Sequence, residues 1–268
     1  MSAAPVAPVV DTHAHVYTLD MPLAGSAWHK PPQDAPVERY VETLAANGVT
    51  HAVLSAASLY GDYNDYQIDA VRRFPHLRTT VIVKPTVDRY ILEMMKRDGV
   101  VGIRFQFRTV PDPPDLTSPD YRMLLRRVAD LDWHVHLHDE GERLARPIAA
   151  LEAAGVKLVI DHFGRPQRDK GVNCGGFQAV LRAIERGRTW VKLSAGYRQE
   201  PPSAAKTYAQ ELLKTGGAQR LFWASDWPFA AFEDNVTYRE TMEDFRNWLP
   251  DDATRHAIHE NAYRFYFG

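Results

Sequence analysis

The sequence predicts a single α/β domain over residues 1–268, with a closed (β/α)8 barrel as the expected architecture. Short apolar segments rich in β-branched residues recur along the chain, and each precedes a longer segment with helical spacing. No Pro/Gly/Ser-rich linker divides the chain, and barrels of this kind commonly run to about 250 residues as one domain. A doubly wound open sheet is the alternative, because it uses the same local units.

Eight segments are candidate strands. They are residues 8–16, 50–57, 78–85, 100–107, 133–138, 156–162, 189–195 and 220–226. The amphipathic segments between them have recognisable ends: residues 36–47 stop at Gly48, and Ser118 precedes a helix whose first residue is Pro119. Strand and helix therefore alternate throughout, although the pattern alone does not close the sheet.

Composition and charge exclude several classes of protein. The chain has 32 Lys plus Arg against 34 Asp plus Glu, so it lacks the basic surplus that binding to a phosphate backbone requires. No secretory leader or long apolar span is evident, so we expect no membrane partner. A lone cysteine, Cys174, excludes an internal disulfide and suits the cytoplasm. Monomer and homo-oligomer both remain open.

Polar residues that are costly to bury collect at the carboxyl ends of the candidate strands, where barrels and open α/β sheets carry their sites. His13 and His15 are two residues apart on a strand, so both rings face one side and form a candidate pair of metal ligands. His138 repeats this position on the fifth strand, and we interpret His134 and His136 as structural. Taken alone, each pair also fits hydrogen-bonded core histidines.

His162 and Asp226 follow the sixth and eighth strands and complete a candidate set for water activation. A divalent ion held by imidazoles and a carboxylate lowers the pKa of bound water from 15.7 towards about 7. We predict that His13, His15, His138 and Asp226 hold one ion, zinc or manganese. Asp226 is the predicted general base, and His162 or His138 steadies the oxyanion. The same groups can orient and deprotonate a water without a metal, so a metal-free enzyme stays open.

Four arginines lie in the fourth candidate strand or follow the fourth, sixth and seventh ones, and guanidinium groups recognise carboxylates with two parallel hydrogen bonds. We therefore expect a small anionic substrate. Neutral hydrogen bonds from nearby loops would supplement these contacts. The predicted substrate-binding residues are Arg104, Arg108, Arg165, Arg198, Ser58, Tyr60, Asn64 and Tyr197. Arg104 is the best supported of them, because it lies inside an apolar strand.

Five motifs together resemble the amidohydrolase-related metal-dependent hydrolases, a TIM-barrel family. They are DTHAH, GIRFQF, IDHFGRP, WVKLSAGYR and ASDWP. Within that family the chain resembles the 2-pyrone-4,6-dicarboxylate, sulfomuconolactone and sugar lactonases. The resemblance implies hydrolysis of a small lactone, with Arg104, Arg108 and Arg198 gripping substrate carboxylates. His138 matches the fifth-strand ligand of metal-binding members, which favours one metal.

Two departures from the family pattern refine this expectation. The fourth strand has no inward lysine to bridge two metals, so a binuclear centre is not expected. Trp28, His29 and Lys30 stand where the pyrone dicarboxylate enzymes have a tyrosine, which leaves the particular acid open.

Two other functions remain as alternatives. A metal-dependent decarboxylase of a muconate-type or aromatic acid would use the same barrel and ligands, and release of carbon dioxide would identify it. A binding protein that has lost catalysis would hold an acid tightly without turnover.

Overall fold

The computed structural model describes residues 7–268 and confirms the predicted (β/α)8 barrel. Each strand pairs in parallel with the next, in the order of the sequence. The strands are β1 (Val10–Ala14), β2 (His51–Leu54), β3 (Leu77–Val81), β4 (Val100–Gln106), β5 (His134–His138), β6 (Lys157–Ile160), β7 (Thr189–Leu193) and β8 (Leu221–Trp223).

Contacts between β1 and the segment after β8 close the barrel, which the sequence pattern could not show. The His15 amide donates to the Trp227 carbonyl at 2.7 Å, and the Asp226 amide donates to the His13 carbonyl at 2.9 Å. A parallel bridge pairs Ala14 with Trp227. The closing hydrogen bonds therefore run through the residues that carry the predicted chemistry.

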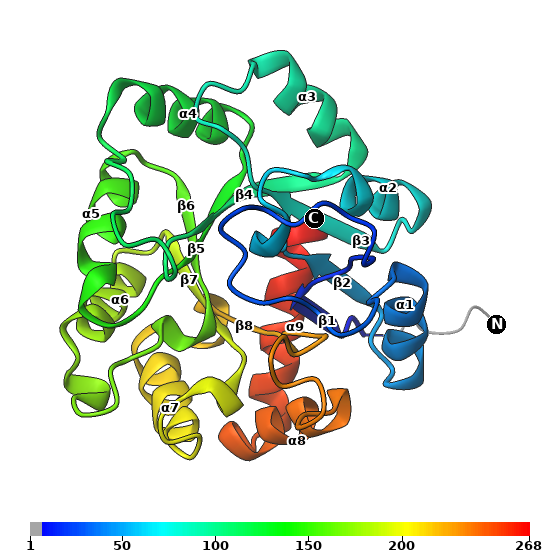
Figure 1. The fold of residues 1–268 in the computed structure, drawn as a ribbon. Coiled ribbons are helices and arrows are strands. Elements are labelled where there is room, and N and C mark those ends of the chain that lie inside the picture. The colour runs from blue at the N-terminus through cyan, green and yellow to red at the C-terminus, as the bar shows by residue number, and fades with distance from the viewer. Residues whose placement is uncertain (1–6) are drawn as a thin grey trace.

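Helices form a ring outside the strands (Figure 1). They are α1 (Val37–Ala46), α2 (Asp65–Arg73), α3 (Arg89–Asp98), α4 (Pro119–Asp130), α5 (Ala145–Ala153), α6 (Gly175–Glu185), α7 (Ala204–Gly216), α8 (Tyr238–Trp248) and α9 (Asp252–Phe267). Pro119 is the first residue of α4, as predicted, and α1 stops short of Gly48, which has a φ of +69°. No helix in the described part of the chain is long and apolar enough to cross a membrane.

The last helix, α9, closes the amino-terminal mouth of the barrel. In Figure 1 it passes behind the strands, with the C-terminus near the middle of the barrel. Tyr266 and Ala262 of α9 pack in one cluster with Val10, Val53 and Phe222 from the strands. The opposite, carboxyl-terminal mouth is left open for a site.

Candidate active site

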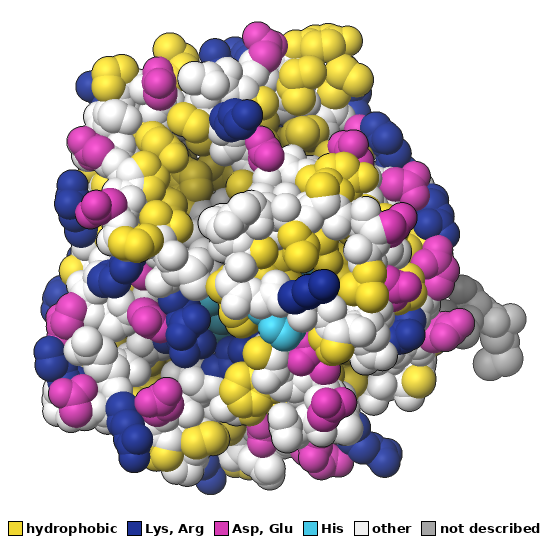
Figure 2. All heavy atoms as spheres, viewed as in Figure 1, with side chains coloured by type: hydrophobic (Ala, Val, Ile, Leu, Met, Phe, Trp, Pro, Cys, Tyr) yellow, Lys and Arg dark blue, Asp and Glu magenta, His cyan; other side chains and the backbone are white. Residues whose placement is uncertain are grey.

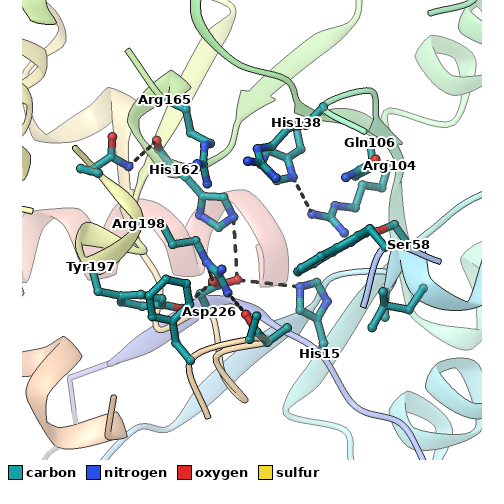
Figure 3. Close-up of a pocket in the computed structure, with 18 of the residues that line it drawn as sticks. His15, Ser58, Arg104, Gln106, His138, His162, Arg165, Tyr197, Arg198 and Asp226 are labelled. Carbon is teal, nitrogen blue, oxygen red and sulfur yellow. Dashed lines mark hydrogen bonds and ion pairs between the residues drawn. The ribbon is translucent and has the colours of Figure 1, made fainter. Parts of the chain in front are cut away.

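A cavity of about 330 Å³ opens at the carboxyl ends of the strands. Figure 2 shows basic and histidine side chains around a hollow on this face, and Figure 3 shows the side chains that point into it. Ten of the predicted site residues line the cavity: His15, Ser58, Arg104, Arg108, His138, His162, Arg165, Tyr197, Arg198 and Asp226. They come from segments up to 211 residues apart in sequence, counted from His15 to Asp226.

Three hydrogen-bond acceptors converge at the inner end of this cavity. The Nε2 atoms of His13 and His15 are 3.1 Å apart, and the Asp226 Oδ1 atom lies 3.6 and 3.8 Å from them. His162 Nε2 lies 3.7 Å from the same oxygen. His13 itself is fully buried beneath the cavity rather than lining it.

The hydrogen bonds made by the Nδ1 atoms of His13 and His15 determine which ring nitrogen carries the proton. His15 Nδ1 donates to the Ser55 carbonyl at 2.7 Å, and His13 Nδ1 donates to the Asp161 carboxylate at 3.1 Å. Burial lowers the pKa of His15 to about 4 and that of His13 well below its usual range, so both rings are neutral at pH 7. Their Nε2 atoms therefore carry no proton, and the lone pairs of these two atoms face each other.

Two bare nitrogens and a carboxylate oxygen so close together repel one another unless a cation lies between them. Zinc bonds of 2.0–2.1 Å in a tetrahedron place neighbouring ligand atoms about 3.3 Å apart. The observed separations of 3.1 to 3.8 Å are near that value. His13, His15 and Asp226 therefore fit a single divalent ion, with His162 beside them as a further donor.

His138, the fourth predicted metal ligand, lies apart from this set. It groups with Asp161 and His162 instead, and its ring centroid is 4.9 Å from that of His162. Its Nδ1 is 3.5 Å from Arg104 Nη2, while its buried Nε2 has no hydrogen-bond partner among the described residues. The position beside Asp226 that we predicted for His138 is taken by His162.

A layer of charged residues lies beneath the acceptor set, and sequence reasoning missed its role. Asp161 is fully buried and binds Arg104 Nη2 at 3.2 Å in addition to His13 and His136. Lys192 Nζ lies 3.0 Å from His136 Nε2 and donates to the Thr12 carbonyl at 2.7 Å. These partners join β1, β4, β5, β6 and β7.

The Lys192 amine lies within another of the acceptor clusters. His13, His136 and Asp161 form a second group close enough to share an ion. Lys192 Nζ already lies among their atoms, 3.5 Å from His13 Nδ1 and 3.9 Å from Asp161 Oδ1. Burial lowers the pKa of Lys192 to about 7. An ion shared by this lower group would have to displace the Lys192 amine.

The second oxygen of Asp226 is held by two donors from the segment after β7. Tyr197 Oη donates to Oδ2 at 2.7 Å, and Arg198 Nε donates to it at 2.9 Å. Burial alone would raise the pKa of Asp226, but the charge of the Arg198 guanidinium outweighs burial, so the pKa is lowered. Asp226 is thus a fixed anion whose Oδ1 faces the histidines (Figure 3).

Left-handed backbone conformations aim two of these side chains into the cavity. Asp226 has a φ of +67° and His162 a φ of +50°. His162 lies two residues after the end of β6, and Asp226 lies three residues after the end of β8. Residues other than glycine rarely adopt this region, and they keep it only where the surroundings enforce it. The closing hydrogen bond from the Asp226 amide to His13 is one such constraint.

The four arginines are held in different ways. Arg104 also donates to the Ala56 carbonyl at 2.7 Å, and Arg198 to the Ala230 carbonyl at 2.7 Å. Arg108 and Arg165 share one carboxylate, that of Glu140, which sequence analysis did not select. All four guanidinium groups reach the cavity.

Two predicted substrate contacts do not line the cavity. Asn64 is buried, and its amide nitrogen donates to the carbonyls of Asp62 and Ile82. Tyr60 is also buried and packs against the ring of Tyr17, with 5.5 Å between centroids. We therefore assign Asn64 and Tyr60 to packing of the segment after β2.

The cavity also contains residues that sequence analysis did not propose as contacts. Tyr17, Trp28, Gln106 and Gln199 all line it. Gln106 is two residues after Arg104 on β4, so the alternation of a strand could have indicated it. Trp28 belongs to a long segment without regular structure, whose position no periodicity reveals.

The fold agrees with what comparison with known proteins shows. The sequence profile of the amidohydrolase family matches residues 10–268, and the chain belongs to this family.

Its relatives include lactone hydrolases. The 4-sulfomuconolactone hydrolase of Hydrogenophaga intermedia is 30% identical over 91% of this chain and 82% of its own length. A solved structure from Pseudomonas putida, described as a candidate 2-pyrone-4,6-dicarboxylic acid hydrolase, has a TM-score of 0.90 and 34% identity, covering 97% of both chains. A related structure from Acinetobacter baumannii holds citric acid, with a TM-score of 0.92 and 28% identity over 96% of this chain and 98% of its own.

Proposed function

We propose that this protein is a lactonase that opens a small lactone bearing a carboxylate or sulfonate. The observation that supports this most directly is the convergence of His13, His15 and Asp226 at the inner end of a cavity lined by arginines. Two of the relatives described above are named as hydrolases of a sulfonated lactone and of a pyrone dicarboxylic acid. The structure from Acinetobacter baumannii holds citric acid, a small molecule with three carboxylates.

In the proposed reaction, a water oxygen attacks the ring ester carbonyl carbon. Asp226 Oδ1 accepts the water proton, and the carbonyl oxygen becomes an oxyanion close to His138. Collapse of the tetrahedral intermediate breaks the bond between the carbonyl carbon and the ring oxygen. The proton on Asp226 then passes to the departing ring oxygen, so Asp226 ends as a carboxylate.

The lowered pKa of Asp226 places a condition on this mechanism. A carboxylate of low pKa is a weak base, so it needs a water that is already acidic. We propose that His13, His15, His162 and Asp226 hold one divalent ion, zinc or manganese. When bound, such an ion lowers the pKa of its water and polarises the carbonyl.

The arginines position the substrate for this attack. Arg198 and Tyr197 hold Asp226 in place, whereas Arg104, Arg108 and Arg165 offer N–H groups towards the cavity. A carboxylate or sulfonate on the lactone would bind there with charge-assisted hydrogen bonds. Uncharged lactones of the same size should therefore be poor substrates.

The test is hydrolysis of a panel of carboxylated, sulfonated and uncharged lactones by the purified protein, with measurement of bound zinc and manganese. We expect Asp226→Asn to lower kcat by about 10²- to 10⁴-fold, as loss of a general base does, with the fold retained. Undiminished hydrolysis by this variant would contradict the assignment of the base. Removal of the metal by a chelator should lower kcat, and restoring zinc or manganese should recover it.

The same panel separates the alternatives. Two decarboxylases, one of them with bound manganese and an inhibitor, share this fold at 14–15% identity, which shows similarity of fold alone. Carbon dioxide released from an aromatic or muconate-type acid would favour that reaction. An acid that binds tightly but never turns over would favour a binding protein.

A further inference from the structure

Arg108 and Arg165 differ from the other two arginines of the cavity in how their charge is balanced. Arg104 has the Asp161 carboxylate at 3.2 Å, and Arg198 has that of Asp226 at 2.9 Å. Arg108 Nε and Arg165 Nε instead meet the same oxygen, Glu140 Oε2, at 2.6 and 3.3 Å. Two guanidinium groups and one carboxylate leave a single positive charge at this place.

The order of the strands produces this arrangement. Arg108 follows β4, Glu140 follows β5 and Arg165 follows β6, and these three strands are neighbours in the barrel. Glu140 therefore stands between the two arginines. Burial and the nearby Arg108 guanidinium lower the pKa of Arg165, as expected where positive charge is crowded.

Glu140 reaches the arginines from the side away from the reacting centre. Both arginines line the inner cavity and also an adjoining outer cavity of about 430 Å³, whereas Glu140 lines only the outer one. Its carboxylate meets their Nε atoms, and no hydrogen bond from the terminal Nη atoms of either arginine to a described residue is found. Those Nη groups stay available to a ligand in the inner cavity.

We propose that Glu140 is a specificity-determining residue that limits this end of the cavity to one anionic group of the substrate. This inference rests on the proposed function, because it concerns the same substrate pocket. A single carboxylate or sulfonate matches the one positive charge that remains. A ligand with more negative charge there meets repulsion from Glu140, which lies on the other side of both guanidinium groups.

The experiment measures the binding of unreactive anions by titration calorimetry, at fixed pH and ionic strength. Citrate carries three carboxylates and lactate carries one. Glu140→Gln keeps an oxygen that can accept from Nε and removes only the charge. We expect the variant to bind citrate about threefold to tenfold more tightly than the native protein, with a smaller gain for lactate.

The control variant is Glu142→Gln, which makes the same change at a glutamate two residues after Glu140. Glu142 also lines the outer cavity, but it pairs with Lys170 at 2.9 Å rather than with the arginines. Its citrate affinity should equal that of the native protein. A purely structural role for Glu140 would not produce a gain that grows with the charge of the ligand.

Three results would overturn the inference: unchanged or weaker citrate binding by Glu140→Gln, an equal gain for both anions, or no citrate binding by either protein. These outcomes are separable from the fate of the proposed function. If lactones are not hydrolysed but citrate affinity rises as expected, the reaction is wrong and the role of Glu140 stands. If lactones are hydrolysed while citrate affinity is unchanged, the proposed reaction stands and the role of Glu140 is wrong.

Discussion

At the scale of single residues, the orientation of each imidazole in the site depends on one neighbour from another strand. Ser55 on the segment after β2 accepts from His15, and Asp161 accepts from His13. Ser194, after β7, pairs with His162 Nδ1 at 2.8 Å. Such partners fix which ring nitrogen faces the reacting centre, and their loss typically costs about 10- to 100-fold in activity or metal affinity.

Ser194→Ala tests this dependence. The variant removes the partner of His162 Nδ1, so the ring can rotate and change tautomer. We expect kcat/KM to fall by about 10-fold or more. The control is Ser203→Ala, because the Ser203 side chain makes no capping hydrogen bond at the start of α7. Equal kcat/KM for the two variants would show that Ser194 does not orient His162.

The candidate site could be predicted from sequence where a residue's own position carries the signal. His13, His15, His162 and Asp226 were found because each is a polar residue at the carboxyl end of an apolar strand. Glu140 was not found, because an acid in a polar loop looks like an ordinary solvated residue. Its role depends on two partners, 32 and 25 residues away in sequence, that only the strand order brings to it.

At the scale of elements, α9 is fixed to β1 by a hydrogen bond that requires a neutral histidine. The Val10 amide donates to His259 Nδ1 at 3.1 Å, and the ring packs between Trp223 and Phe245. Spacing along one helix could not show that the partner of His259 is 249 residues away.

This contact makes stability depend on pH. Burial lowers the pKa of His259 to about 4, against an ordinary value of 6.5. Between these values the unfolded chain binds the proton and the folded chain does not, so stability falls as the pH drops from 6.5 towards 4. His259→Gln keeps a side-chain acceptor for the Val10 amide but does not titrate.

We expect the free energy of unfolding of the native protein to fall by about 1–2 kcal/mol more than that of His259→Gln between pH 7.5 and pH 5.0. Urea denaturation at the two pH values measures this difference. His256→Gln is the control, since His256 is exposed on the same helix. Identical losses in the native protein and His259→Gln would show that His259 is not held neutral.

At the scale of the whole molecule, the two mouths of the barrel have separate tasks. Hydrogen bonds between β1 and the segment after β8 close the carboxyl end around the site, while α9 closes the other end with apolar side chains. The eight strands and their alternation with helices followed from the sequence pattern, whereas their order in a closed barrel is seen only in the structure. The closing of the amino-terminal mouth did not follow from the pattern either, because the C-terminal segment is polar in sequence and only a few of its side chains face the barrel.

Substitutions of Tyr266 test whether the two mouths of the barrel act independently. Tyr266 is buried in the floor of the barrel, and its hydroxyl has no hydrogen-bond partner among the described residues. Tyr266→Ala leaves a cavity beside Phe222 and should lower the free energy of unfolding by about 3–5 kcal/mol, as removal of a large core ring does. Tyr266→Phe removes only the unpaired hydroxyl, so its stability should equal or exceed that of the native protein. Under conditions in which both variants are folded, kcat/KM should be that of the native protein, because the reacting centre lies at the other mouth. Loss of activity in folded Tyr266→Phe would show that the floor and the site are coupled.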